Sequence, residues 1–366
     1  MNIGIDISQA VYQETGVGKY TIGLINGILD HDDTNDWTFL YSSLRADLSP
    51  GLLQKIKSSR HRLIHIPLPP TLLSFLWNTL HIMSIELFTG TLDLFITSDW
   101  TEPPAKCKKM TIIHDLVYLR YPETVHKSIL STQTQRMKWV KKESSHIIAT
   151  SNATKTDITS LLNIPENKIS TIYAGIDIIS TSQKNQEEVL RKYAIKKPFI
   201  LAVGKIEPRK NIARLIDAFS KTKQEWNLVI VGQQGWDTIS PEKKNANISF
   251  TGKVSEIELH ALYELCSFFT FPSLWEGFGH PVIEAMKHKK AVITSKVPSL
   301  LEVVGGNALL CDPLSIEDIH KSIQSLIADE SLRSNLSEKG YVYSQQFTWK
   351  RYMNELLILI QKLKNN

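Results

Sequence analysis

The sequence predicts an α/β protein in which two mainly parallel, doubly wound sheets form separate domains. Apolar runs alternate with amphipathic helical patterns along the chain, which is the order expected of parallel sheets covered by helices. A polar stretch at residues 180–188 interrupts this alternation about halfway along. A chain of 366 residues is long for one hydrophobic core and sufficient for two.

The expected strands of the first domain are short apolar runs bounded by turn residues. They occupy residues 2–7, 37–41, 62–66, 92–97, 110–114, 146–150 and 168–173. The strand patterns of the second domain occupy residues 199–203, 228–231, 248–251, 268–271, 291–294 and 308–310. We therefore expect Rossmann-like domains over residues 1–176 and 177–346, followed by a terminal helix over residues 347–366.

Bulk composition excludes several classes of protein. A hydrophobic content of 42% with 22% charged residues is typical of a globular protein and excludes extensive disorder. The net charge of +5 is too small to indicate a nucleic-acid partner, although it suits anionic substrates or an anionic membrane surface. The cysteines Cys107, Cys266 and Cys311 lie far apart and have neither metal-ligand nor redox spacing.

Hydropathy predicts a cytoplasmic protein. The chain opens directly as a strand pattern without an export signal, and no stretch of about 18 residues is apolar enough to span a bilayer. The most apolar segment, Leu68–Phe88, is interrupted by Asn78, His81 and Glu86. This pattern favours a helix of the hydrophobic core, with a helix lying on a membrane surface as the alternative.

A glycine-rich turn joins a strand pattern to a helix pattern at residues 273–284. Such a turn aims free backbone N–H groups at a bound phosphate, and Pro281 suits the start of the helix. Glu276 and Glu284 frame the turn, and each carboxylate can accept hydrogen bonds from sugar hydroxyls. Taken singly, Glu284 could merely complement the helix dipole and Glu276 could be a surface residue. The glycines between them favour a ligand site.

A second strand-to-helix junction carries two adjacent cations, Arg209 and Lys210, close after Gly204 and Lys205. Positive charge near the N-terminus of a helix is unfavourable unless an anion is bound there. The pattern therefore indicates a phosphate site rather than a solvated surface.

The first domain contributes two weaker signals. Gly16 and Gly18 follow the first strand and open a helix, so they either bring the backbone close to a ligand or form a plain tight turn. His114, followed by Asp115, ends another strand at the carboxyl edge, where doubly wound sheets bind ligands.

Taken together, these motifs resemble the retaining glycosyltransferases of family 4, whose signature is the glutamate pair around Gly-Phe-Gly. The resemblance covers nearly the whole chain and is strongest at residues 204–210 and 273–284. It implies the GT-B fold, in which two facing Rossmann-like domains enclose a cleft. It also implies that the terminal helix, residues 347–366, crosses back to the first domain.

The resemblance assigns roles in the second domain. Glu276 would contact the donor sugar, Gly279 beside Phe278 and the helix start would hold the diphosphate, and Glu284 would bind the ribose hydroxyls. A basic residue followed by a lysine supports the diphosphate in the family. Lys210 matches that lysine, and either Lys205 or Arg209 makes the first contact.

The remaining roles also follow from the resemblance. Val254 lies where the family holds the nucleotide base, and His114 would be the active-site histidine that reaches the donor sugar. The loop of Gly16 and Gly18 would lie near the donor phosphates and the acceptor. One departure from the family is Leu301, which stands before Glu302 where a proline is usual.

The motifs at residues 15–20, 114–122 and 204–211 look most like bacterial mannosyltransferases that build O-antigen or other surface polysaccharides. The expected activity is transfer of mannose from GDP-mannose to a lipid-linked glycan, with peripheral association at the inner membrane. A UDP-sugar donor is the alternative within the same class.

The expected chemistry needs no cofactor and no metal. Arg209, Lys210 and the helix start near Gly279 can stabilise the departing diphosphate in place of a metal ion. Asp30, Asp32 and Asp33 formally make an Asp-x-Asp motif, but it lies in a polar tail after a helix.

Three rival functions remain open beside that of a transferase. A glycoside hydrolase could use Glu276 and Glu284, but it would not explain the cationic junction. An epimerase on the same scaffold is a second rival, and a catalytically silent partner subunit is a third. The joint presence of His114, Lys210 and both glutamates argues against a silent subunit.

Overall fold

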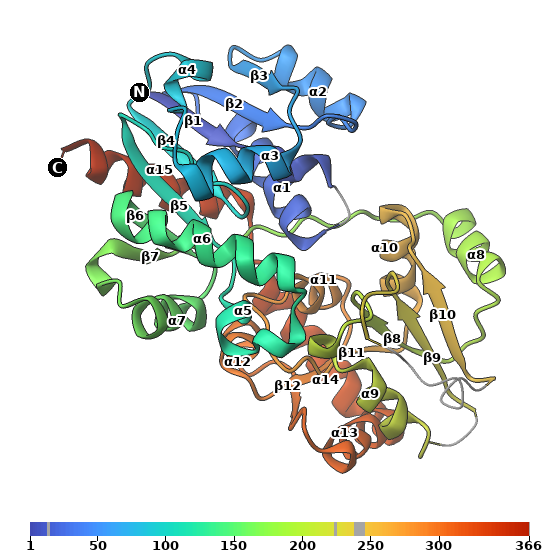
Figure 1. Ribbon diagram of the computed structural model, residues 1–366. Helices are drawn as coiled ribbons and strands as arrows, with labels where there is room; N and C mark the ends of the chain where they lie inside the picture. Colours follow the sequence, from blue (N-terminus) through green and yellow to red (C-terminus); the bar gives the residue numbers. More distant parts are fainter. Residues whose placement is uncertain (13–14, 223–224, 238–245, 366) are drawn as a thin grey trace. The chain divides into compact units, whose positions relative to one another are not determined.

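The computed structural model describes residues 1–12, 15–222, 225–237 and 246–365. It divides into two compact units, coloured along the chain in Figure 1. Unit 1 comprises Met1–Gly175 with Phe347–Asn366, and unit 2 comprises Ile176–Gln346. The first division falls one residue before the boundary expected from the sequence, and the second coincides with it. The cleft expected between the domains stays a prediction.

Unit 1 is built on a parallel sheet with the strand order β3-β2-β1-β4-β5-β6-β7. Its strands are β1 (Asn2–Asp6), β2 (Asp36–Ser42), β3 (Arg62–Ile66), β4 (Leu94–Ser98), β5 (Lys108–Ile113), β6 (Ser144–Ala149) and β7 (Ile169–Thr171). The order reverses between β1 and β4, so the carboxyl ends of these two strands flank the switch point where such sheets bind ligands.

Helices and short helical turns connect the strands of unit 1 (Figure 1). The α-helices are α1 (Gly16–His31), α2 (Pro50–Lys57), α3 (Pro70–Ser74), α4 (Glu86–Thr89), α5 (Val117–Arg120), α6 (Lys127–Glu143), α7 (Asn152–Leu162) and α15 (Trp349–Asn365). The shorter turns are η1 (Ser8–Val11), η2 (Phe75–Leu80), η3 (Pro122–Thr124) and η4 (Glu166–Lys168).

Unit 2 repeats the plan with a parallel sheet of order β10-β9-β8-β11-β12-β13. Its strands are β8 (Phe199–Val203), β9 (Asn227–Val231), β10 (Ile248–Gly252), β11 (Phe268–Phe271), β12 (Val292–Ser295) and β13 (Leu309–Cys311). Its helices are α8 (Gln183–Lys192), η5 (Pro208–Lys210), α9 (Ile212–Phe219), α10 (Glu256–Leu265), α11 (His280–Lys287), α12 (Pro298–Val304), α13 (Ile316–Ala328) and α14 (Glu330–Ser344).

These two Rossmann-like sheets confirm the predicted fold class. Their central strands are almost fully buried, as expected of parallel strands covered on both faces by helices. In unit 2 the reversal of strand order lies between β8 and β11. The cationic junction and the glycine-rich turn follow those two strands, so the fold brings the two strongest sequence motifs to one edge of one sheet.

The terminal helix α15 packs on α1 and belongs to unit 1, as the family resemblance implied. Trp349, Tyr352 and Met353 of α15 are buried, and the Tyr352 hydroxyl is hydrogen-bonded to that of Tyr20 on α1. The burial of these large side chains explains why a helix so late in the sequence completes the first domain.

The apolar segment Leu68–Phe88 is not the single core helix that the sequence favoured. It forms α3, a π-helical turn η2 and α4, interrupted by His81 and Met83 in the left-handed conformation. Leu73, Trp77 and Ile85 are buried, while other apolar side chains of the segment remain exposed. In the ranges that the structure describes, no helix has the length and apolar character needed to cross a membrane.

Candidate functional site

The glycine-rich turn of unit 2 connects buried strand β11 to helix α11. Gly279 precedes the helix with a φ of 101°, and a Cβ there would lie 2.6 Å from Leu300 Cδ2. Both the backbone angle and the lack of space therefore require glycine. The helix begins at His280, so Pro281 is its second residue, where the missing N–H still costs nothing. Phe278 is buried beside this start, with its ring edge-on to His280.

Arg209 and Lys210 lie directly against Glu276. Arg209 Nη1 donates to Glu276 Oε2 at 2.6 Å, and Lys210 Nζ donates to Glu276 Oε1 at 2.7 Å. Arg209 also donates to the Trp275 carbonyl and to Glu207 Oε1. The sequence interpretation gave the cations to a phosphate and Glu276 to a sugar. The structure joins these three residues into one cluster, which we call the Glu276 cluster.

Main-chain contacts hold the two loops of the Glu276 cluster together. The Leu274 N–H donates to the Arg209 carbonyl at 2.8 Å, and Asn211 Nδ2 donates to the Pro272 carbonyl at 2.9 Å. A Cβ on Gly204 would lie 3.2 Å from Lys210 Cδ, so glycine lets the lysine stem run along the strand end. The positions of both cations are thus set by the backbone as well as by the ion pairs.

Electrostatics keep Glu276 ionised although it is only 7% exposed. Burial alone would raise the pKa of Glu276, but Arg209 and Lys210 outweigh it and lower the pKa to about 2. Burial lowers the pKa of Lys210, and Arg209 adds to this effect while Glu276 opposes it. An ammonium group carries three donor protons, and Glu276 accepts one from Lys210, so the cluster can also engage an anion.

Lys205 does not join the Glu276 cluster. It is exposed, and its Nζ lies 4.7 Å from the centre of the Trp236 ring. Of the two candidates for the first phosphate contact, Arg209 is therefore the one that lies beside Lys210. Val254 is half-buried in the loop between β10 and α10.

Glu284 lies on α11 and is held by residues that the sequence analysis missed. The Tyr263 hydroxyl donates to Glu284 Oε2 at 2.9 Å. The Tyr263 ring stacks on His288, whose Nε2 lies 2.7 Å from His260 Nδ1. His288 stands four residues after Glu284, and this spacing places both residues on one side of α11, where Tyr263 contacts each of them. The spacing is the signal in the sequence that could have indicated a shared partner. Glu284 is buried and therefore does more than complement the helix dipole.

Acidification should destabilise unit 2 through His288. Burial, together with His260, lowers the pKa of His288 to about 4, below the value near 6.5 expected in the unfolded chain. The neutral imidazole thus contributes stability above pH 6.5, and this contribution is lost as the pH falls towards 4, by roughly 2 kcal/mol. Thermal unfolding followed at pH 7 and pH 5 should show the loss. His288→Gln should flatten the dependence, and an unchanged slope in this variant would contradict the assignment.

In unit 1, His114 follows β5 at the carboxyl edge of the sheet, as predicted. Its Nε2 lies 3.1 Å from Ser98 Oγ at the end of neighbouring strand β4. The ring of Tyr20 lies edge-on to the His114 ring, with ring centres 4.7 Å apart. The main-chain carbonyl of His114 accepts a hydrogen bond from the Thr150 hydroxyl. Ser98 and Tyr20 thus set the orientation of the imidazole, and neither was singled out from the sequence.

The glycines of the first loop lie at the start of α1. Gly16 is the first residue of the helix, and the Gly18 N–H donates to the side chain of Thr15, which caps the helix. The Gly18 amide therefore serves the cap, and the Gly16 position leaves open space where a side chain would stand.

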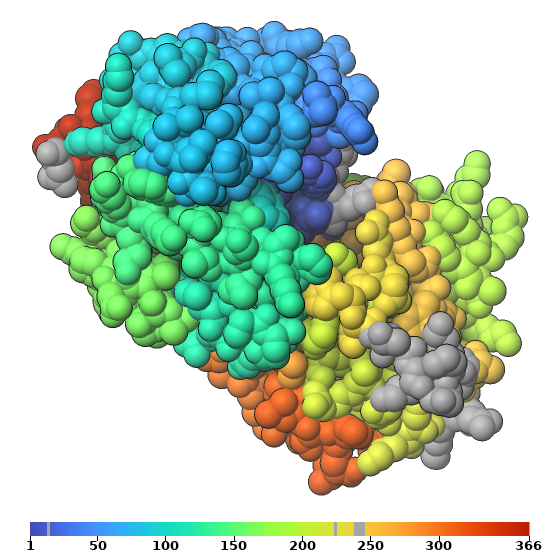
Figure 2. Space-filling view, in the orientation of Figure 1, coloured from blue at the N-terminus to red at the C-terminus, as the bar shows by residue number. Residues whose placement is uncertain are grey.

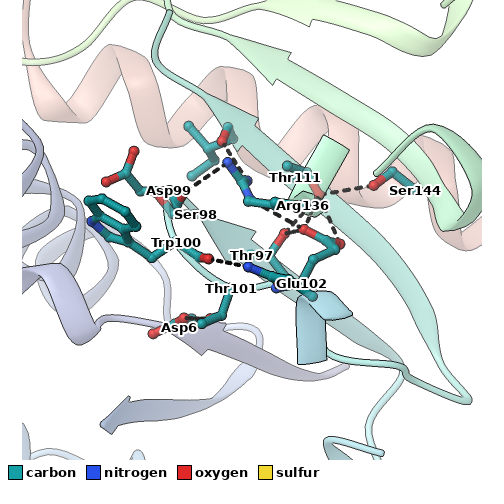
Figure 3. A network of polar contacts seen from close by, with 12 residues as sticks. Asp6, Thr97, Ser98, Asp99, Trp100, Thr101, Glu102, Thr111, Arg136 and Ser144 are labelled. Carbon is teal, nitrogen blue, oxygen red and sulfur yellow. Dashed lines mark hydrogen bonds and ion pairs between the residues drawn. The ribbon is translucent and has the colours of Figure 1, made fainter. Parts of the chain in front are cut away.

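A buried polar network lies along strands β4 and β5 of the unit 1 sheet (Figure 3). Arg136 donates to the Asp99 carbonyl at 3.1 Å and lies 3.6 Å from the carboxylate of Glu102, which is fully buried and also pairs with Lys109. Burial raises the pKa of Asp99 to about 6, and the nearby Asp115 and Asp6 carboxylates contribute to this shift. Asp99 is a polar residue at a strand end, the same signal that singled out His114.

One carboxylate of the Asp-x-Asp motif, that of Asp32, has a structural role. Asp32 is buried just after α1, and its carboxylate accepts hydrogen bonds from Thr34, Asn35 and the Trp37 indole. Asp30 is half exposed and pairs with Lys55. Over the described residues, no group of three or more His, Cys, Asp or Glu side chains is arranged to hold a metal ion.

Two sequence models of glycosyltransferases match the chain, one for each unit. Residues 29–180 match glycosyltransferase family 4, and residues 183–343 match the glycosyl transferases group 1. The chain is 26% identical over 357 residues to O-antigen chain mannosyltransferase B of Escherichia coli, covering 93% of this chain and 94% of that protein. It is 28% identical over 367 residues to O-antigen chain mannosyltransferase RfbU of Salmonella typhimurium, covering 94% and 95%.

Further similarities are to a longer relative and to solved structures. The chain is 25% identical to the serotype-specific mannosyltransferase WbdA of Escherichia coli and spans 45% of its length. The structure of Anabaena Alr3699/HepE in complex with UDP and glucose has a TM-score of 0.72 at 17% identity. The match covers 99% of this chain and 100% of that one. WaaG, a glycosyltransferase involved in lipopolysaccharide biosynthesis, has a TM-score of 0.72 at 14% identity, covering 97% of this chain and 98% of that one.

The two sequence models lie on the two Rossmann-like units, and the solved structures share that fold. This agreement confirms the resemblance seen in the sequence. The chain is a glycosyltransferase of the GT-B fold, with its N-terminal half in family 4 and its C-terminal half in group 1.

Proposed function

We propose that this glycosyltransferase is a retaining mannosyltransferase that moves mannose from GDP-mannose to a growing lipid-linked glycan of the O-antigen type. The observation that carries the proposal is the Glu276 cluster at the switch point of unit 2, because it gathers two cations beside a helix start. The choice of mannose rests on the names of the relatives, two of which match this chain over nearly the whole length of both proteins.

The cluster suits the chemistry of the donor. As the bond between the anomeric carbon and the phosphate oxygen breaks, negative charge grows on the departing diphosphate. Arg209, Lys210 and the N–H groups at the start of α11 would stabilise that charge. Glu276 would orient both cations and face the positive charge developing on the sugar. We propose that no metal ion and no cofactor is required, since the cations supply the electrostatic role of a metal.

Retention of configuration requires that the acceptor oxygen attack the face that the diphosphate leaves. The bond to the acceptor oxygen forms as the bond to the phosphate oxygen breaks, and the hydroxyl proton passes to the leaving phosphate. In this proposal His114 contacts the donor sugar from unit 1, Glu284 binds the ribose, and Phe278 with Gly279 lines the diphosphate. Val254 would lie near the base, and Gly16 and Gly18 near the acceptor. A lipid-linked acceptor would bring the enzyme to the surface of the inner membrane.

A UDP-sugar donor is the second candidate. It is favoured by one observation, namely that the solved structure of Anabaena Alr3699/HepE, which shares the fold, contains UDP and glucose. The two candidates differ in the base and the sugar and share every residue of the Glu276 cluster. A direct test of nucleotide binding therefore separates them.

The test is thermal unfolding in EDTA with GDP, UDP, ADP and their sugar conjugates. Ligand at about a hundred times its dissociation constant adds roughly 2.7 kcal/mol of stability, a shift of about 5–10 °C for a domain of this size. We expect GDP and GDP-mannose to give this shift without metal. A shift with UDP alone would replace the donor, a strict need for metal would reopen the Asp30–Asp33 motif, and no shift would favour a hydrolase or a silent subunit.

A further inference from the structure

The segment Pro70–Thr89 of unit 1 turns an apolar side towards solvent. Between residues 71 and 87, the exposed positions are two threonines and six large apolar residues, and none of them is charged. Exposed sides of helices are normally polar, and contiguous apolar surface marks a binding site. We call these six residues the apolar face: Leu72, Phe75, Leu80, Ile82, Met83 and Leu87.

The opposite side of the segment is anchored, so the apolar face is a built feature. Trp77 is buried, and its indole donates to the Met83 carbonyl at 3.0 Å. Asn78, also buried, donates to the Trp100 carbonyl at 2.8 Å. His81 contacts the Glu143 carboxylate at 2.8 Å and stacks on Trp139 with ring centres 3.5 Å apart. These contacts stabilise the left-handed backbone of the loop and direct its apolar side chains outward.

Lysines border the apolar face. Helix α6 packs against η2, and its last two turns carry the exposed lysines Lys138, Lys141 and Lys142. Lys142 Nζ lies 5.2 Å from the centre of the Trp139 ring, which itself stacks on His81 of the loop. At the α4 end of the segment, exposed Lys106 lies close by, because its backbone N–H donates to Glu86 Oε1 at 2.7 Å. Figure 2 shows this part of unit 1 in blue and teal on the side facing the viewer, with α6 below it.

We propose that the apolar face and its lysine border form the surface by which unit 1 binds an anionic phospholipid bilayer. The apolar side chains would enter the boundary between headgroups and acyl chains, while the lysines would meet the lipid phosphates. The lysines argue against a second copy of this chain as the partner, because a two-fold contact would bring like charges together. The inference adds a docking surface to the lipid-linked acceptor of the proposed function, and it can be tested without donor or acceptor.

The test is sedimentation of the full chain with vesicles of phosphatidylcholine, with and without phosphatidylglycerol. We expect binding to the vesicles that contain phosphatidylglycerol and much weaker binding to the neutral ones. Leu80→Ser combined with Leu87→Ser should lower the partition coefficient by about tenfold or more. The matched control is Leu314→Ser combined with Val342→Ser, which removes side chains that are 68% and 65% exposed in unit 2 and should bind like the wild type.

A charge variant tests the lysine border separately. Lys141→Gln combined with Lys142→Gln should weaken binding roughly fivefold per lysine at low salt and should reduce the dependence on salt. Equal binding by the wild type and the Leu80→Ser, Leu87→Ser variant would overturn the proposal, as would a wild type that binds neither kind of vesicle. A concentration-dependent dimer that the same variant abolishes would also overturn it in favour of self-association.

The outcome is independent of the proposed function. The Leu80→Ser, Leu87→Ser variant should keep the nucleotide-induced thermal shift of the wild type, because neither residue belongs to the Glu276 cluster. Loss of vesicle binding with that shift intact supports the docking surface. Absence of the shift in the wild type would count against the donor assignment and would leave the vesicle result unaffected.

Discussion

Replacing Lys210 with alanine should lower kcat/KM for sugar transfer by about a hundredfold or more. The ammonium group lies 2.7 Å from Glu276 Oε1 beside the start of α11, where the departing diphosphate would gather charge. Removing one preorganised donor at a developing charge typically costs about 10²–10³ in rate. The measurement is steady-state transfer from GDP-mannose in EDTA, and turnover near that of the wild type would remove Lys210 from the diphosphate site.

The same substitution should also affect stability, because it leaves the buried Glu276 carboxylate with Arg209 as its remaining partner among the described ion pairs. We expect unit 2 to lose about 1–3 kcal/mol. The double variant Lys210→Ala, Glu276→Gln should recover part of this stability without recovering activity. Lys205→Ala is the matched control, because that lysine lies on Trp236 outside the cluster and should retain most of the activity.

Replacing Glu276 with alanine should lower kcat by about a hundredfold and change the KM for the donor much less. The carboxylate holds Arg209 and Lys210 in place and would face the positive charge of the transition state, so its loss removes an interaction made mainly there. Glu284→Gln is the comparison, since the loss of a contact to the ribose should raise the KM for the donor. A Glu276 variant whose defect lies only in donor affinity would contradict this assignment.

The pH dependence sharpens the Glu276 prediction. Because its pKa is lowered to about 2, Glu276 stays ionised in the folded protein at any pH well above that value. Its ion pairs contribute stability above the unfolded value near 4.3, and this is lost only as the pH falls towards 2. The acid limb of activity should therefore have the same midpoint in Glu276→Gln as in the wild type. A midpoint that moves in this variant would show that Glu276 titrates during catalysis.

Much of the fold could be predicted because its signals are local. Each strand of the two sheets is an apolar run followed by a turn, and each such run was recognisable without knowledge of its neighbours. The glycine-rich turn before α11 was recognisable for the same reason, since glycine is required by the backbone angle at Gly279. The segment Leu68–Phe88 was misjudged, because hydropathy alone does not tell which side of an apolar segment is covered.

Two doubly wound domains, a glycine-rich turn at residues 273–284 and a cationic junction at residues 204–210 could all be recognised in the amino-acid sequence. The folded structure was needed to show that Arg209 and Lys210 pair with Glu276, that Lys205 lies outside this cluster, and that Ser98 and Tyr20 contact His114. These contacts join residues that lie far apart along the chain. Periodicity and turn chemistry act over a few residues, whereas an ion pair between residues 66 positions apart exists only after crossover helices have placed two strands side by side.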